Sequence, residues 1–178
     1  MSQPTPIRIR PATLPDLIWL RLLYAQMQAE KPLPYPDYRE PTSLEAFTAS
    51  LAQRLESDPR LLVWVAEEGP VVGGFILTEV VDRPVGAPHR YGVCYWLYVV
   101  PQWRGTGVGR QLSAAALLAA RDRGCESIEI AAAPGDDQWL RRGWTPVAVT
   151  LALPLDGVAA SLVPTRLPNG HAQEAPDA

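Results

Sequence analysis

The chain has 178 residues, of which 47% are hydrophobic and 20% charged, and its formal net charge at pH 7 is −3. This length and composition are typical of one soluble globular domain. An acidic chain argues against non-specific nucleic-acid binding, and no apolar run approaches the ~20 residues of a membrane-spanning helix. Two cysteines and two histidines are too few for a disulfide framework or a metal-ligand cluster. We therefore expect a cytoplasmic protein with no metal, nucleic-acid or membrane partner.

The first third of the chain predicts one short strand and two helices. Residues 7–10 alternate apolar and basic side chains, which indicates a strand. Thr13 to Asp16 has the pattern of a capping box and opens a helix to about Ala29. After a proline-rich loop at 31–42, Thr42 to Glu45 repeats that signal and opens a helix to about Ser57.

The rest of the chain predicts strands with two further helices. Strands are expected at 61–67, 71–81, 90–100, 127–133 and 145–153, the first two joined as a hairpin through residues 68–70. Helices are expected at 107–123 and 136–142. The predicted order is β-α-α-β-β-β-α-β-α-β. We expect one domain over residues 1–155 and a poorly ordered tail over 156–178, where apolar periodicity fades.

The turn between the strand at 90–100 and the helix at 107–123 carries the clearest chemical signal. It reads Leu-Tyr-Val-Val-Pro-Gln-Trp-Arg-Gly-Thr-Gly-Val-Gly-Arg over residues 97–110. Glycines at 105, 107 and 109 let the main chain adopt positive φ and approach a ligand closely. The N–H groups of a helix start attract anions, and Arg104 and Arg110 flank this start with positive charge. A pyrophosphate suits such a site.

Three other interpretations of this turn compete with a coenzyme pyrophosphate site. A dinucleotide-binding fold requires Gly-x-Gly-x-x-Gly directly after a strand, whereas the spacing here is Gly-x-Gly-x-Gly and too few residues follow for the remaining strands. A P-loop requires Gly-Lys-Ser/Thr, and the single lysine of the chain is Lys31. A ligand-free glycine-rich turn stays open as the third interpretation.

The segment resembles the GNAT superfamily of acyl-CoA-dependent N-acyltransferases. The family motif is Arg/Gln-x-x-Gly-x-Gly/Ala, and Arg104-Gly-Thr-Gly-Val-Gly109 matches it in the same place along the order of strands and helices. The resemblance covers about residues 7–153. It implies an α/β fold with a mixed, mostly antiparallel central sheet and helices on both faces.

The resemblance also implies an acetyl-CoA site. The pyrophosphate would be held by the main-chain N–H groups of Arg104, Gly105, Thr106, Gly107, Val108, Gly109 and Arg110. The main chain of Leu97 and Val99 would pair with the pantetheine arm as an added strand. An N–H near Val99 would bind the thioester oxygen as an amine attacks the carbonyl directly. Cys94 and Cys125, which lie outside the motif, are expected in the core.

Two features of the family are missing. The tyrosine that protonates the leaving thiolate in many members is replaced by Trp139, whose indole cannot ionise usefully. The glutamate that several members carry on the fourth strand corresponds to Val93. Strand alternation predicts that Tyr95 stands on that same face, together with Leu97 and Val99. Tyr95 and Glu79 are therefore the candidate catalytic residues, with His89, in the loop before the strand, as a third. Packing in the sheet and a solvated edge charge are the alternatives for the first two.

The acceptor site should be lined by the first two helices and the loop between them, where Tyr35 and Tyr38 are candidate substrate contacts. We expect an N-acetyltransferase that moves an acetyl group from acetyl-CoA to a primary amine of a small molecule or peptide. The alternative is a non-catalytic acyl-CoA-binding or regulatory module. The sequence leaves the acceptor unidentified and leaves both a monomer and a homodimer open.

Overall fold

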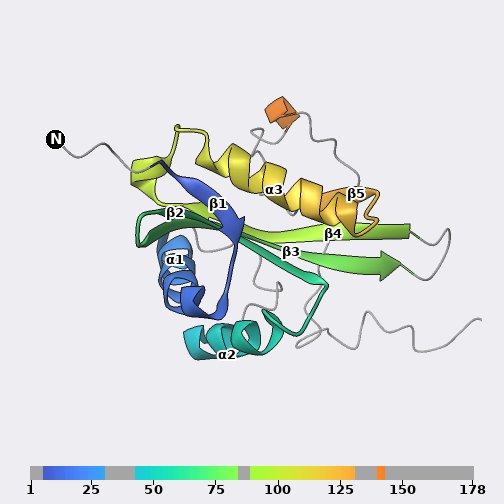
Figure 1. Cartoon of the computed structure of the whole chain (residues 1–178), viewed down its shortest axis with the longest axis horizontal. Coiled ribbons are helices and arrows are strands. Elements are labelled where there is room, and N and C mark those ends of the chain that lie inside the picture. Colours follow the sequence, from blue (N-terminus) through green and yellow to red (C-terminus); the bar gives the residue numbers. More distant parts are fainter. Residues whose placement is uncertain (1–5, 31–42, 84–88, 131–139, 143–178) are drawn as a thin grey trace, which may run out of the picture. The chain divides into compact units, whose positions relative to one another are not determined.

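The computed structural model describes residues 6–30, 43–83, 89–130 and 140–142, and these residues include a five-stranded sheet (Figure 1). The spatial order follows the chain order: β1 (Arg8–Pro11), β2 (Leu61–Glu68), β3 (Val71–Arg83), β4 (His89–Val99) and β5 (Ser127–Ile130). The first three neighbouring pairs are antiparallel and β4–β5 is parallel. The predicted mixed, mostly antiparallel sheet is confirmed.

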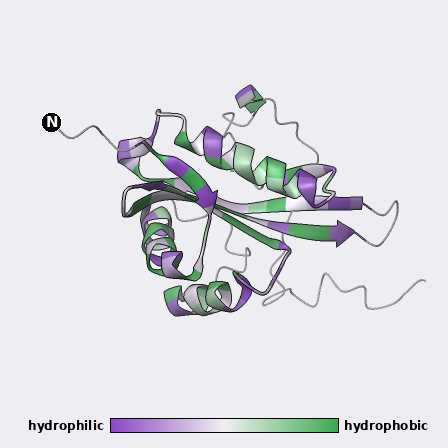
Figure 2. Cartoon of the chain, viewed as in Figure 1, coloured by the Kyte–Doolittle hydropathy of each residue, from purple (hydrophilic) through white to green (hydrophobic). Residues whose placement is uncertain are grey.

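Helices cover both faces of this sheet. Helices α1 (Leu17–Glu30) and α2 (Leu44–Arg54) lie on one face, and α3 (Val108–Asp122) crosses the other (Figure 1). Short 3-10 turns precede α1 (Leu14–Asp16) and α3 (Pro101–Trp103), and a third lies at Leu140–Arg142. Hydrophobic and hydrophilic residues are interspersed along α3, as expected of a helix with one face on a sheet (Figure 2). No helix among the described residues combines the length and apolar character needed to cross a membrane.

Each face of the sheet has its own core. The larger set of buried residues packs between the sheet and helices α1 and α2, and includes Leu20, Leu23, Tyr24, Phe47, Leu51, Val63, Val65, Phe75, Leu77 and Tyr98. A second set packs between the sheet and α3, and includes Ala66, Ile76, Cys94, Val99, Val108, Leu112 and Ala116. The predicted core placement of Cys94 is confirmed, whereas Cys125 is partly buried beside a smaller third cluster.

An aromatic cluster joins α1, α2 and β4 within the larger core. The rings of Tyr24 and Phe47 stack with centroids 4.1 Å apart, and Trp96 meets both edge-on, at 5.1 Å and 5.5 Å. Such pairs add specific geometry to the hydrophobic burial. The cluster fixes how the two helices sit against the strand that carries the candidate site.

Several predicted boundaries shift by one or a few residues. The second helix is capped by Ser43, whose hydroxyl accepts the Ala46 N–H at 3.1 Å, rather than by Thr42. His89 is the first residue of β4 and not part of the preceding loop. The end of α3 at Gly124 is confirmed, with φ of 77° and its N–H bonded to the Arg121 carbonyl. The strand at 145–153, most of the helix at 136–142 and the boundary at 155–156 lie outside the described residues.

The turn before α1 is held by a buried carboxylate. Asp16, with 4% of its surface exposed, accepts two bonds from the Arg10 guanidinium at 2.7 Å and 2.8 Å and one from the Thr13 N–H at 2.7 Å. The Arg10 hydrogen bonds, assisted by those from Thr13, hold the pKa of the Asp16 carboxyl below its ordinary value despite its burial. The charge therefore contributes to stability near neutral pH.

Asp16→Asn should lower the free energy of unfolding by about 2 kcal/mol at pH 7, because it removes a charged hydrogen-bond acceptor from a buried arginine contact. The folded-state pKa is depressed, so this stabilisation is complete above the unfolded pKa of about 3.9 and is lost as pH falls through the folded value. Urea unfolding at pH 7 and pH 3 measures the change. Asp122→Asn is the control, because Asp122 is exposed and 3.8 Å from Arg121; an equal effect of both variants would contradict the prediction.

Candidate active site

Strand β4 has strand neighbours on both sides only in its first half. Residues Tyr91–Cys94 pair with β5, but β4 continues to Val99, and no residue of the described segments pairs with this second half on the β5 side. The Val100 N–H donates to the Gly73 carbonyl of β3 at 2.8 Å. Because main-chain groups of alternate residues point to opposite neighbours, those of Leu97 and Val99 point away from β3. They form an open edge to which an extended ligand can add.

The glycine turn follows directly from this open edge. Gly105 and Gly107 have φ of 78° and 91°, which only glycine adopts readily, and a Cβ on either would meet no atom within 4 Å. Gly107 is the residue before α3 and offers no side-chain cap, so the N–H groups of Val108, Gly109 and Arg110 have no partner within the helix. The buried Val108 side chain anchors the helix start. The open space at Gly105 and Gly107 and the N–H donors at the start of α3 suit an anion.

Arg104 is bound to the end of β4. Its Nε donates to the Val99 carbonyl at 2.8 Å, its guanidinium pairs with the Glu30 carboxylate at 2.5 Å, and its own N–H donates to the Pro101 carbonyl at 3.2 Å. The side chain also lies over the Tyr98 ring, with Cζ 5.4 Å from the centroid. The expected positive charge beside the turn is therefore neutralised in part by Glu30. Arg104 contributes chiefly by holding the turn against the strand.

Glu30 links three elements, and sequence reasoning missed it. It ends α1, pairs with Arg104 after β4, and accepts the Tyr98 hydroxyl at 2.6 Å. Burial first, and Glu30 second, raise the pKa of Tyr98 to about 12, so its hydroxyl remains a donor near neutral pH. No local signal marks Glu30, because its partners lie far along the chain.

A β-bulge separates the paired half of β4 from its open half. Leu77 of β3 faces Trp96 and the next residue, Thr78, faces Cys94, so the register shifts by one residue and Tyr95 is the extra residue of β4. A bulge disrupts the ladder and increases the twist of the strand that carries it. It lies one residue beyond the last pair between β4 and β5, where the open edge begins.

The bulge corrects the predicted orientation of Tyr95. The side chain packs with Trp96 in the core on the α1 and α2 face, at a centroid distance of 5.9 Å, whereas Leu97 packs on the α3 face. The prediction that Tyr95 shares a face with Leu97 and Val99 is wrong, because the extra residue breaks the two-residue alternation. Its predicted catalytic role is a separate matter and stays a prediction.

Glu79 is tied to helix α2. Its carboxylate accepts from the Arg54 guanidinium at 2.7 Å, and the same guanidinium pairs with Asp58 at 2.7 Å. The Glu79 side chain is a quarter exposed. It therefore belongs to a half-buried ion pair and is not a solvated charge at the edge of the sheet. The structure does not bring Glu79 together with the glycine turn, which lies at the other end of β3. A role for Glu79 as a base stays a prediction.

The remaining candidates lie apart from the open edge or outside the described residues. The His89 ring packs 5.3 Å from that of Tyr91 at the far end of β4. Tyr35, Tyr38 and Trp139 lie outside the described residues. Cys94 is 4% exposed, and burial raises the pKa of its thiol to about 12, so it is not a thiolate near neutral pH.

Known proteins share both the sequence pattern and the fold. The model of the acetyltransferase (GNAT) family matches residues 21–141. An aminoglycoside N(6')-acetyltransferase type 1 from Stenotrophomonas maltophilia is 34% identical over 97 residues, which is 53% of this chain and 59% of that relative. The match thus spans less than two thirds of the relative's length.

Two solved structures illustrate the shared fold. A predicted acetyltransferase from Clostridium acetobutylicum, determined with acetyl-CoA, has a TM-score of 0.71 at 19% identity over 84% of this chain and 97% of that one. An aminoglycoside N-acetyltransferase determined with coenzyme A has a TM-score of 0.68 at 19% identity over 86% and 97%. With the family match, these findings establish the class: the chain belongs to the GNAT family of acetyltransferases.

Gly107→Glu should raise the Kd for coenzyme A at least tenfold, because it places a carboxylate where the phosphates would bind. Isothermal titration calorimetry measures this change. Gly124→Glu is a matched control, since Gly124 also has positive φ and open space around its Cβ position but lies at the far end of α3. Both variants should lose similar stability. Equal coenzyme A affinity in the two would show that the turn does not bind the phosphates.

Proposed function

We propose that this protein is an N-acetyltransferase that transfers an acetyl group from acetyl-CoA directly to a primary amine of a small molecule. The main support for this proposal is that the open edge of β4 leads directly into the glycine turn. An extended pantetheine arm can pair with the main chain of Leu97 and Val99. The pyrophosphate then reaches the free N–H groups at the start of α3 without a break in the path.

The residues present fit acetyl-CoA. The open edge supplies the N–H and C=O groups of Leu97 and the N–H group of Val99, whose carbonyl accepts from Arg104 Nε. The turn around Gly105 and Gly107 leaves room above the main chain for a phosphate. Bound there, acetyl-CoA supplies an activated thioester to the attacking amine.

Main-chain positioning is the chief contribution of the protein to the reaction. A main-chain N–H at the open edge would bind the thioester oxygen as negative charge develops on it. The sheet and turn would hold the thioester against the amine, which removes much of the entropic cost of bringing two reactants together. Neither step needs a covalent enzyme intermediate, which agrees with the buried, protonated thiol of Cys94.

A small amine acceptor is the substrate class best supported. The relative from Stenotrophomonas maltophilia carries the name of an aminoglycoside acetyltransferase, and aminoglycosides present several primary amines on a polycationic frame. The formal charge of −3 on this chain is compatible with attraction of such a cation. Aminoglycosides are therefore the first compounds to test.

Thiol release from acetyl-CoA against a panel of primary amines tests the proposed activity. We expect release above the rate of spontaneous hydrolysis with at least one aminoglycoside, and mass spectrometry should find a product heavier by one acetyl group. Coenzyme A binding with no release for any amine in the panel would instead favour the non-catalytic acyl-CoA-binding module.

Tyr95→Phe tests the catalytic role of the residue at the bulge. A hydroxyl that relays the amine proton predicts a fall in kcat of ~10²-fold with unchanged coenzyme A affinity. The ring and the fold are retained. Tyr91→Phe is the control, because Tyr91 lies on the same strand in the half paired with β5. Unchanged kcat for Tyr95→Phe would leave Tyr95 as a packing residue.

A further inference from the structure

Two adjacent glycines, Gly73 and Gly74, interrupt the apolar side chains of strand β3, and both are buried. The register between β2 and β3 shifts between Ala66 and Glu67, so that Gly73 is the extra residue of β3 at a β-bulge. Glycine inside a strand weakens the strand, and it commonly marks a bulge or a place where another part of the protein approaches the main chain closely. Both conditions are met here.

The indole ring of Trp103 lies directly against Gly73. A Cβ atom on Gly73 would stand 2.5 Å from Cζ3 of the ring and 2.6 Å from Cε3, well short of van der Waals contact. Only glycine lets a ring lie this close to the main chain. Trp103 ends the 3-10 turn Pro101–Trp103 that follows β4, and its ring packs against the core between the sheet and α3. The ring therefore rests on the main chain of β3.

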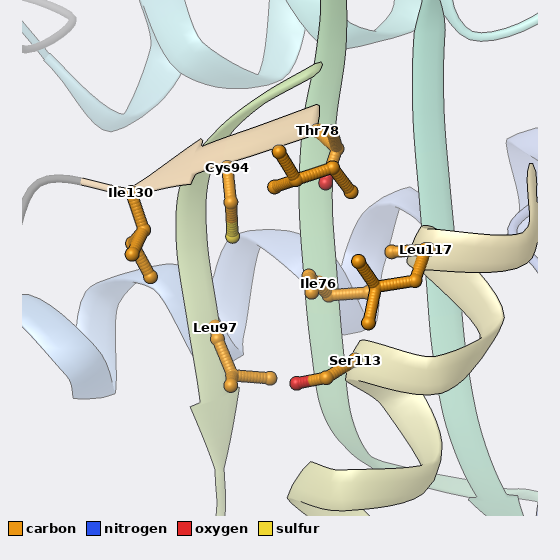
Figure 3. A pocket seen from close by; sticks show the side chains of 9 residues that line it. Ile76, Thr78, Cys94, Leu97, Ser113, Leu117 and Ile130 are labelled. Atoms are coloured by element: carbon orange, nitrogen blue, oxygen red, sulfur yellow. The ribbon is translucent and has the colours of Figure 1, made fainter. Parts of the chain in front are cut away.

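The second glycine leaves room for helix α3 in the same way. A Cβ atom on Gly74 would lie 3.3 Å from the Cδ1 atom of Leu112 and 3.1 Å from the Tyr98 carbonyl oxygen, both closer than ordinary van der Waals contact. The next residue of the helix, Ser113, points toward Leu97 of β4 (Figure 3). The 3-10 turn before the glycine turn and the helix after it therefore rest on adjacent residues of one strand.

The glycine turn between them depends on Trp103 for its height above the sheet. At Gly105 and Gly107, no atom of the described segments lies within 4 Å of a Cβ position, so nothing packs against that side of the turn. The Thr106 hydroxyl donates to the Trp103 carbonyl at 2.7 Å, and the Trp103 N–H donates to the Val100 carbonyl at 3.0 Å. A displaced Trp103 would thus move the turn together with its main-chain N–H groups.

We propose that Trp103 is a positioning residue of the donor site, which rests on Gly73 and so fixes the phosphate-binding turn above β3. This inference rests on the proposed function. The Arg104 side chain holds the same turn to the end of β4, and Trp103 holds it to the neighbouring strand. Hydrogen bonds from main-chain N–H groups to phosphate are directional, so a small shift of the turn weakens several of them together. The role requires no contact between the ring and the coenzyme.

Variants on both sides of this contact test the proposal through calorimetric binding of coenzyme A. Gly73→Ala places a methyl group where the ring lies, and Trp103→Leu removes the ring. Each should raise the Kd for coenzyme A about tenfold, as expected from the loss of one charge-assisted hydrogen bond. In the double variant the smaller leucine leaves room for the methyl group. Its Kd should be no higher than that of either single variant, whereas independent effects would multiply to about a hundredfold and overturn the proposal.

A second ligand identifies the phosphates that are affected. Dephospho-coenzyme A keeps the pyrophosphate and lacks the phosphate on the ribose. Its Kd should therefore rise in Trp103→Leu by the same factor as that of coenzyme A. A rise confined to coenzyme A would assign the effect to the ribose phosphate and overturn the proposal. Trp103→Leu adds no atom to the sheet, so this measurement is decisive even if Gly73→Ala does not fold.

Gly92→Ala is the matched control. A Cβ atom on Gly92 would lie 2.9 Å from Cγ1 of Ile128, so this variant is also crowded, but it stands in the half of β4 that pairs with β5. Its Tm should fall by an amount similar to that of Gly73→Ala, with unchanged coenzyme A affinity. Equal losses of affinity in the two glycine variants, or an unchanged Kd in Trp103→Leu, would overturn the role of Trp103 and leave the proposed function intact. Failure of wild type to bind coenzyme A would overturn the proposed function itself.

Discussion

The interruption of pairing between β4 and β5 is the constraint on which the candidate site depends. The two strands pair from Tyr91 to Cys94, and the bulge at Tyr95 then turns β4 away from a regular ladder. Main-chain groups beyond that point must find partners elsewhere, because unpaired buried N–H and C=O groups are costly. An extended amide-containing ligand can satisfy them.

The bulge also divides the side chains of β4 between the two cores. Before it, Cys94 packs toward α3; after it, Leu97 and Val99 do so, while Tyr95 and Trp96 both pack toward α1 and α2. A strand without the extra residue would alternate regularly. One insertion therefore places the adjacent side chains of Tyr95 and Trp96 on the same face of the sheet.

A second constraint comes from the contact between helix α1 and the glycine turn. Glu30 binds both Arg104 and Tyr98, and Arg104 in turn holds the Val99 carbonyl. The ion pair is partly exposed, so its direct contribution to stability is small. Its geometric effect is larger, because it links the last residue of α1 to the end of the open edge. Helix α1, which we expect to border the acceptor amine, is thereby linked to the strand that we propose binds acetyl-CoA.

The sequence by itself determined the elements and the turn, because both depend on local chemistry. Glycine at 105 and 107 is required by positive φ, Gly124 ends α3, and apolar periodicity located the strands and helices of the described segments. The family resemblance followed from the same local pattern. Only the tertiary structure decided the face of Tyr95 and the pairing of Arg104 with Glu30. A single extra residue in a strand reverses the alternation of its side chains, and no residue type marks where this happens. Contacts between residues far apart in the chain leave no periodic pattern in the sequence.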